Sequence, residues 1–334
     1  MASQPVIGVA AMLERIHPLE AIDLAATAEK HGFDGTMVTD HFQPWQPQGG
    51  EASHVWTVLG AMAAQTQGSL GTFAVTAGYR VHPAVIAQAS ASLAAMFPGR
   101  HWLGLGAGEA LNEHVTGGYW PEAPERIGRM FEAVEVIQKL FAAGLAEKDV
   151  RHRGTYFQLE SSRLWTMPAT APEILISTAG PVTARRAGRV ADGIVTNGTN
   201  LEKAAQLLQR FDEGRRDAGR AESPGRKVVR LDLSWAPTEE EAMSNAVSGW
   251  PVAGLRFPRG DVRSPFELEQ MLRTVCPEDM SERMSISSDP DVHRTRIQQF
   301  LDLGFTDIHL HNAGSNTREW IEVFGREVLT KVHT

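Results

Sequence analysis

Two kinds of hydrophobic pattern alternate along the chain. In the longer segments, apolar residues recur every three or four positions, which is typical of one buried face of a helix. The clearest set comprises Ile127, Met130, Phe131, Val134, Ile137, Leu140 and Phe141. The shorter segments are continuously apolar, as expected for parallel strands that are covered on both faces. The chain is therefore predicted to alternate helices with parallel strands.

A glycine followed by a short apolar run occurs three times. The sequences are KHGFDGTMVTD around Gly32, RVADGIVTNGT near Gly193 and DLGFTDIHLHN near Gly304. We expect each glycine to end a helix in the left-handed conformation, and the apolar residues after it to enter a sheet. Further strands are predicted at Val6–Ala11, Leu70–Val75, Trp102–Leu105, Glu173–Ser177 and Val228–Ser234.

The number of these units indicates the architecture. Eight strands alternate with helices over residues 1–334, and no shift in composition marks a linker. We therefore predict a single α/β domain, a (β/α)8 TIM barrel, in preference to two doubly wound halves. A helix from Ala84 to Met96, with Pro83 in its first turn, would be one of the outer helices. The Pro- and Arg-rich segment from Gly249 to Pro265 is expected to be an insertion at the C-terminal face.

Polar residues follow several of the predicted strands. The sequence VTDHFQPWQPQGG places Asp40, His41 and Trp45 directly after the second strand. Thr76, Glu109, Ser177–Pro181 and Asn197 follow the third to sixth strands, and Glu14 follows the first. Because TIM barrels carry their active sites at the C-terminal ends of the strands, these side chains are expected to meet at one mouth.

His41 forms a candidate acid/base group with the carboxylates Glu109 and Glu14. An imidazole and a carboxylate can exchange protons with a ligand when both lie within hydrogen-bond reach of it. Taken alone, His41 could instead be a structural or surface residue. The indole of Trp45 lies in a loop rich in Pro, Gly and Gln. There it would be a flat wall or a hydrogen-bond donor for a ligand, unless it is a core aromatic.

Two loop sequences are compatible with ligand binding. WLGLGAGEALNEH has the spacing G-x-G-x-G, which differs from the dinucleotide motif, and its glycines could simply permit a tight turn. The carboxylate of Glu109, immediately after them, favours a role in proton transfer. STAGPVTARRAG, residues 177–188, would present backbone amides at the start of a helix. That arrangement is either an anion site for a phosphate group or an ordinary turn.

Composition narrows the range of ligands. The net charge of −8 arises from mixed charges without basic blocks, which argues against nucleic acid as a partner. We find no signal pattern and no long apolar run, so we expect a cytoplasmic protein without a membrane span. The single cysteine, Cys276, excludes an internal disulfide. The twelve histidines show no H-x-x-x-H or H-E-x-x-H spacing, so no metal site is predicted. Small molecules are the expected ligands.

Several longer motifs resemble those of one enzyme family. TDHFQPWQPQGG, TAGYRVHPAVIAQA, GLGAGEALNE and SSDP are similar to blocks of the luciferase-like barrel superfamily. Within it they resemble the glucose-6-phosphate dehydrogenases that use the deazaflavin coenzyme F420. The similarity extends from about Val6 to Leu329. The blocks DHFQPW and GEALNE separate this branch from the flavin-dependent monooxygenases of the same fold.

The resemblance implies that coenzyme F420 binds in the barrel mouth. The residues that would contact it are Asp40, Thr76, Ala107, Gly108, Asn112, Ala179, Gly180, Val182 and Thr183. A cis peptide bond between Phe73 and Ala74 is also implied, and these two residues would form a bulge that supports the deazaflavin ring.

The implied reaction transfers a hydride from a carbinol carbon of the substrate to the deazaflavin. His41 would accept the hydroxyl proton and Glu109 would exchange a proton with the coenzyme, or the two would have the opposite roles. Trp45 would stabilise the oxidised intermediate, and Glu14 would help to hold His41. The family also implies a homodimer that acts in carbohydrate metabolism.

The substrate phosphate would bind at Asn197, Asn200, Arg259 and Arg283. In the enzymes that the chain resembles, these positions hold a Thr, two Lys and an Arg. Asn200 therefore removes one charge, and Arg259 replaces a lysine with a bidentate fork. A pocket with two arginines can still bind a phosphate.

Three alternatives to this function stay open. The first is an F420-dependent dehydrogenase or reductase of a non-phosphorylated secondary or lipid alcohol. The second is an FMN-dependent monooxygenase, and the third is a coenzyme carrier without catalysis.

Overall fold

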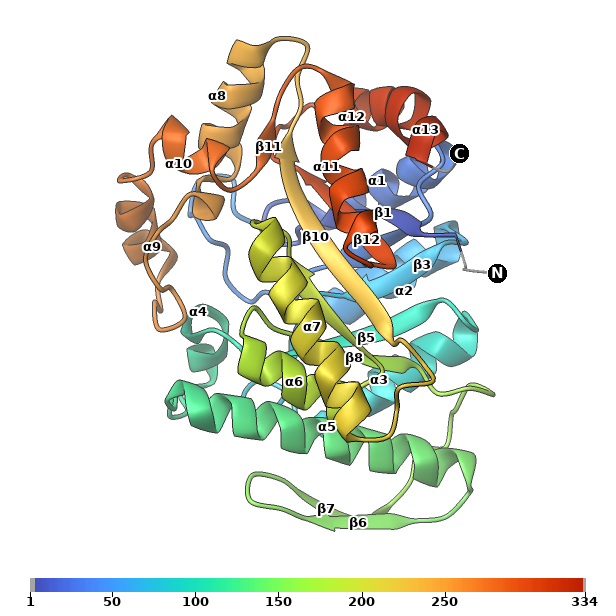
Figure 1. Ribbon diagram of the computed structural model, residues 1–334. Helices are drawn as coiled ribbons and strands as arrows, with labels where there is room; N and C mark the ends of the chain where they lie inside the picture. The colour runs from blue at the N-terminus through green and yellow to red at the C-terminus, as the bar shows by residue number, and fades with distance from the viewer. Residues whose placement is uncertain (1–3, 333–334) are drawn as a thin grey trace.

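In a computed structural model, which describes residues 4–332, the chain forms a closed barrel of parallel strands inside a layer of helices (Figure 1). The strands follow the order β11-β10-β12-β1-β2-β3-β5-β8-β9, and β9 also pairs with β10, which closes the ring. The predicted (β/α)8 barrel is therefore confirmed. Its strands are β1 (Val6–Ala11), β2 (Gly35–Val38), β3 (Ser69–Thr72), β4 (Val75–Thr76), β5 (His101–Gly106), β8 (Glu173–Ser177), β9 (Gly193–Asn197), β10 (Arg226–Ser234), β11 (Ser285–Ile286) and β12 (Asp307–Asn312).

The helices cover the outside of this barrel. Many of them begin with a proline in the first turn, where the missing N–H costs no hydrogen bond and the fixed φ suits a helix. The predicted helix after Pro83 is one of these. The helices are α1 (Pro18–Lys30), α2 (Val55–Gln65), α3 (Pro83–Met96), α4 (Ala110–Glu113), α5 (Ala123–Leu145), α6 (Pro181–Val190), α7 (Leu201–Asp217), α8 (Glu239–Gly249), α9 (Pro265–Leu272), α10 (Pro277–Ser281), α11 (Pro290–Asp302), α12 (Thr317–Phe324) and α13 (Thr330–Val332). Short 3-10 turns span His114–Thr116 and Pro251–Ala253, and a π-helical turn spans Gly325–Leu329. No helix in residues 4–332 is both long and apolar enough to cross a membrane.

Trp102 fills the interior of the barrel. This side chain on β5 is completely buried. Gly71 on the neighbouring strand β3 makes room for it, since a Cβ atom at that position would overlap with the indole ring. The middle of the barrel is thus packed, as in other barrels of this class.

Some local expectations were right and others wrong. Gly32 and Gly304 follow the ends of α1 and α11 with φ of +93° and +101°, as predicted. Gly193 does not end a helix. It is the first residue of β9, where a Cβ atom would overlap with the carbonyl oxygen of Arg226 on β10. The predicted strand Leu70–Val75 is divided into β3 and β4 by the two residues between them.

Two segments leave the regular strand–helix alternation. An antiparallel hairpin, β6 (Val150–Arg153) with β7 (Gln158–Ser162), lies outside the barrel next to α5 and was not predicted (Figure 1). The second segment, residues 250–289, follows α8 and contains α9, α10 and β11. Its backbone reaches the mouth, because Gly260 O accepts a hydrogen bond from Ala110 N at 2.8 Å. The predicted insertion at the C-terminal face is therefore present.

Candidate active site

A cavity of about 440 Å³ opens at the C-terminal ends of the barrel strands. It collects side chains from the ends of most strands and from the 250–289 segment. His41 and Glu109, which were predicted to share one mouth, both line it. The other predicted residues in its lining are Glu14, Asp40, Trp45, Phe73, Ala74, Thr76, Ala107, Gly108, Asn112, Ala179, Asn197, Arg259 and Arg283.

Four predicted residues are not in this lining. Gly180, Val182 and Thr183 lie at the start of α6, next to Ala179, and the side chain of Val182 is 78% exposed. Asn200 caps the N-terminus of α7, where its Oδ1 accepts a hydrogen bond from Lys203 N at 3.0 Å. Asn200 lines a neighbouring pocket, which shares Thr199 and Arg283 with this cavity.

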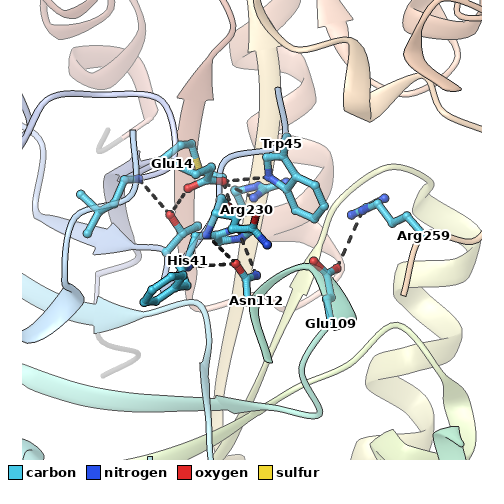
Figure 2. A network of polar contacts seen from close by, with 12 residues as sticks. Glu14, His41, Trp45, Glu109, Asn112, Arg230 and Arg259 are labelled. Atoms are coloured by element: carbon cyan, nitrogen blue, oxygen red, sulfur yellow. Dashed lines mark hydrogen bonds and ion pairs between the residues drawn. The ribbon is translucent and has the colours of Figure 1, made fainter. Parts of the chain in front are cut away.

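Glu14 is the buried centre of the polar network in the mouth (Figure 2). Its Oε1 accepts a hydrogen bond from Trp45 Nε1 at 3.0 Å, and its Oε2 accepts one from the hydroxyl of Thr39. Burial raises the pKa of Glu14, but the nearby charge of His41 and the bond from Thr39 outweigh it, so the pKa lies below the ordinary value. Glu14 is therefore an anion. Since the indole N–H is used by Glu14, Trp45 can offer a ligand only its ring.

His41 has partners at both ring nitrogens. Its Nε2 lies 3.9 Å from Glu14 Oε1, and its Nδ1 lies 3.2 Å from both Gln43 O and Asn112 Nδ2. The Oδ1 atom of Asn112 accepts from the backbone N–H of Phe42 and Gln43, which turns its amide nitrogen towards His41. In the neutral imidazole that carries its proton on Nδ1, Nδ1–H donates to Gln43 O and Nε2, beside Glu14, is free to accept a proton. Both charge states of His41 are thus accommodated, as a proton acceptor requires.

Glu109 approaches the cavity from the other side of the mouth (Figure 2). It precedes α4, at the turn after β5. Its Oε1 lies 3.8 Å from Nε of Arg259, whose guanidinium lies over the ring of Trp45 at 4.9 Å. Both side chains are about one-third exposed, at 30% and 32%, so Glu109 can reach both a ligand and solvent.

A second ion pair beneath the mouth was missed by the sequence analysis. Arg80 bridges Asp40 at 2.8 Å and Glu113 at 3.2 Å. Burial raises the pKa of Glu113, and the charge of Arg80 only partly offsets this. Arg80 and Glu113 both occur inside the quoted motifs TAGYRVHPAVIAQA and GLGAGEALNE. The sequence alone did not show that they lie next to Asp40.

One side of the cavity is lined by small residues and backbone. The peptide bond between Phe73 and Ala74 is cis, as expected. Gly108 has a φ of +81°, and a Cβ atom there would lie 2.8 Å from Thr76. Together with Ala74, Ala107 and Ala179, it lines this side of the cavity with small residues.

Arg230, Asp232 and Trp250 also line the cavity and were not anticipated. Arg230 and Asp232 alternate on the predicted strand Val228–Ser234, so the sequence placed them on one face of that strand. It did not indicate that this face looks into the barrel.

A family model for "Luciferase-like monooxygenase" matches residues 3–307. The F420-dependent glucose-6-phosphate dehydrogenase of Microbacterium testaceum is 35% identical over 328 residues, which cover 97% of this chain and 96% of that protein. The enzyme of the same name from Nocardia farcinica is 34% identical, with coverage of 98% and 97%. The structure of an F420-dependent secondary alcohol dehydrogenase, in complex with an F420–acetone adduct, has a TM-score of 0.92 and 30% identity, with coverage of 98% and 99%.

Proposed function

Because the chain belongs to the luciferase-like family, we propose that it is a dehydrogenase that uses coenzyme F420 to oxidise a CH–OH group of a sugar 6-phosphate, such as glucose 6-phosphate. The observation that carries this proposal is the cavity itself. It joins a proton-accepting imidazole, a carboxylate and two arginines, in a chain similar over nearly its full length to F420-dependent glucose-6-phosphate dehydrogenases.

The residues of the cavity fit the coenzyme. The wall of small residues, Ala74, Ala107, Gly108 and Ala179, would hold the planar ring, and Asn112 and Asp40 would border it. When bound, the coenzyme supplies a carbon atom that accepts a hydride.

The chain would handle the protons of this reaction. His41 would accept the hydroxyl proton at Nε2 when the carbinol C–H bond gives up its hydride. The resulting positive charge is stabilised by the Glu14 carboxylate, 3.9 Å from His41 Nε2. Glu109 would exchange with the coenzyme the proton that accompanies uptake of the hydride. The ring of Trp45 would form a wall of the substrate site. Arg259, Arg283 and Asn197 would bind the phosphate.

The test is F420 reduction by glucose 6-phosphate, glucose and simple secondary alcohols, measured under steady-state conditions. We expect glucose 6-phosphate to be the best of these substrates. Reduction by alcohols but by no phosphorylated sugar would overturn the substrate assignment.

A dehydrogenase of non-phosphorylated secondary alcohols is the second candidate. It is favoured by the position of Asn200 outside the cavity and by the structural likeness to the secondary alcohol dehydrogenase. The FMN-dependent monooxygenase has less support, since the relatives above 30% identity described here are F420-dependent dehydrogenases. Retention of FMN during purification would favour it instead.

We also propose that the enzyme is a cytoplasmic homodimer of single-domain subunits that serves carbohydrate metabolism. These assignments rest on the family resemblance. The pairing of β12 with β1 supports a single domain, because it joins the two ends of the chain in one barrel. Light scattering of the purified protein would measure the oligomeric state.

A further inference from the structure

Three buried polar residues form a chain of contacts at the deep end of the cavity. Arg230 Nη2 donates to Asp232 Oδ2 at 3.0 Å, and His311 Nδ1 lies 2.9 Å from Asp232 Oδ1. Their side chains are 9%, 8% and 7% exposed. Arg230 and Asp232 are two residues apart on β10, and Asp232 lies opposite His311 on β12, so all three share the inner face of the barrel. The proton transfers proposed above use none of them.

This chain of contacts fixes the position of the Arg230 guanidinium. Its Cζ atom lies 5.4 Å from the ring centre of Phe73 and 5.6 Å from that of Trp250. Burial raises the pKa of Asp232, but the charge of Arg230 and the hydrogen bond from His311 outweigh it and hold the pKa well below its usual range. Asp232 is therefore an anion that orients Arg230 before any ligand binds.

Arg230 has more hydrogen-bond donors than the surrounding acceptors use. A guanidinium carries five N–H donors. Among residues 4–332, Arg230 donates to Asp232 and to the thioether of Met12 at 3.7 Å, which is a weak acceptor. Its buried Nε–H has no acceptor in that part of the chain. Since this nitrogen is closed off from the cavity, the donors open to a ligand are the remaining N–H groups of Nη1 and Nη2, and because Arg230 lines the cavity we expect a ligand to supply their acceptor.

Arg230 and the phosphate-binding arginines border different parts of the cavity. Arg259 and Arg283 belong to the 250–289 segment at the rim, whereas Arg230 lies on a barrel strand beside Glu14 (Figure 2). Figure 2 places His41 and Trp45 on the Glu14 side of the mouth and Arg259 beside Glu109. A ligand that extends from the rim past His41 therefore brings its inner end to Arg230.

We propose that Arg230, positioned by Asp232 and His311, is a specificity residue that binds a carboxylate next to the carbinol that is oxidised. The two planar oxygens of a carboxylate match the fork of a guanidinium. Among sugar 6-phosphates, the preferred substrate is then one that carries a carboxylate beside the carbinol, with its phosphate bound by the rim arginines. This inference rests on the proposed function, because it takes the carbinol to react beside His41. A carbonyl oxygen of the coenzyme ring is the other group that could accept hydrogen bonds from Arg230. The experiment distinguishes this carbonyl from a substrate carboxylate.

The experiment compares lactate with 2-propanol, which differ by one carboxylate beside the same carbinol. The ratio of their kcat/KM values is measured with the F420-loaded enzyme, and the Kd of F420 is measured separately by fluorescence titration. Arg230→Met is expected to lower the ratio at least tenfold and to leave the Kd within twofold. Arg230→Lys keeps a cation beside Asp232, so this variant can be measured if Arg230→Met does not fold. It should lower the ratio several-fold. Arg283→Met is the matched variant at the rim, and it should impair glucose 6-phosphate without changing the ratio.

The possible outcomes are distinct. An unchanged ratio of the kcat/KM values in both Arg230 variants overturns the proposal. If the Kd of F420 also rises tenfold in these variants, the acceptor belongs to the coenzyme ring. If glucose 6-phosphate does not reduce F420 in the wild type, the proposed function has failed, whereas inactivity of lactate and 2-propanol alone leaves the proposed function standing. Calorimetric titration of lactate and 2-propanol into the F420-loaded proteins then measures the Kd of each alcohol. Arg230→Met should lower the preference for lactate over 2-propanol, expressed as the ratio of these Kd values, at least tenfold.

Discussion

The guanidinium of Arg259 lies between Glu109 and Trp45, 3.8 Å from the carboxylate and 4.9 Å from the indole ring. A residue proposed to bind the substrate phosphate is thus paired with a residue proposed to move a proton. A bound phosphate would compete with Glu109 for the same guanidinium. Binding of the substrate would therefore release Glu109 from its ion pair just when the proton is needed.

The first prediction concerns this arginine. Arg259→Ala should lower kcat/KM for glucose 6-phosphate by roughly 30-fold, equivalent to about 2 kcal/mol, because a charged donor to the phosphate is lost. The value for 2-propanol should change much less. Steady-state kinetics with both substrates measure the difference, and equal losses would contradict a role in phosphate binding.

The second prediction concerns His41. His41→Ala should lower kcat by about 10²- to 10⁴-fold, as expected when a general base is removed, with little change in the Kd of F420. Single-turnover reduction of F420 and fluorescence titration measure the two quantities. A carrier protein without catalysis would instead bind F420 tightly and show no activity that His41→Ala could reduce.

The third prediction concerns the pH dependence of stability. The pKa of Glu14 lies below its ordinary value of 4.5 in the folded protein, so the unfolded chain binds this proton more readily. The stabilisation from the Glu14 anion is fully present above pH 4.5 and is lost as the pH falls through the folded pKa. Glu14→Gln should therefore flatten the acid limb of the stability curve. Thermal unfolding of the wild type and of Glu14→Gln, at pH values at and below 4.5, measures this difference. Parallel acid limbs in the two proteins would contradict the prediction.

The fourth prediction concerns the packed interior. Gly71→Ala should destabilise the protein by about 3 kcal/mol or more, because its Cβ atom would overlap with Trp102. Gly60→Ala is the matched control. No atom lies within 4 Å of a Cβ at that position in α2, so this change should stabilise the helix by about 0.5–1 kcal/mol. Denaturant unfolding measures both, and similar effects would contradict the packing argument.

Local sequence predicted the barrel because most strands are short, largely apolar runs that are followed by polar residues. His41, Glu109 and Trp45 could be placed at one mouth for the same reason. The β6–β7 hairpin was missed because its residues are mostly exposed or half-buried and show no regular apolar face. Gly193 was misread because a glycine that caps a helix and a glycine that lets two strands approach look alike in a sequence.

Contacts between distant segments could not be read from local patterns. Arg80 meets Asp40 and Glu113 only after the chain closes around the barrel, across separations of 40 and 33 residues. Asp232 and His311 are 79 residues apart and meet through the register of β10 with β12. The cap that Asn200 forms on α7 could not be read from the sequence either, because a local pattern does not show which backbone N–H the side chain binds.

Trp102 gives the enzyme a single entrance. Since the indole blocks passage through the barrel, coenzyme and substrate must enter and leave by the same opening. A ring held against the strand ends would be covered by a substrate whose phosphate stays at the rim. The coenzyme would then enter first and leave last, which makes the kinetic mechanism ordered.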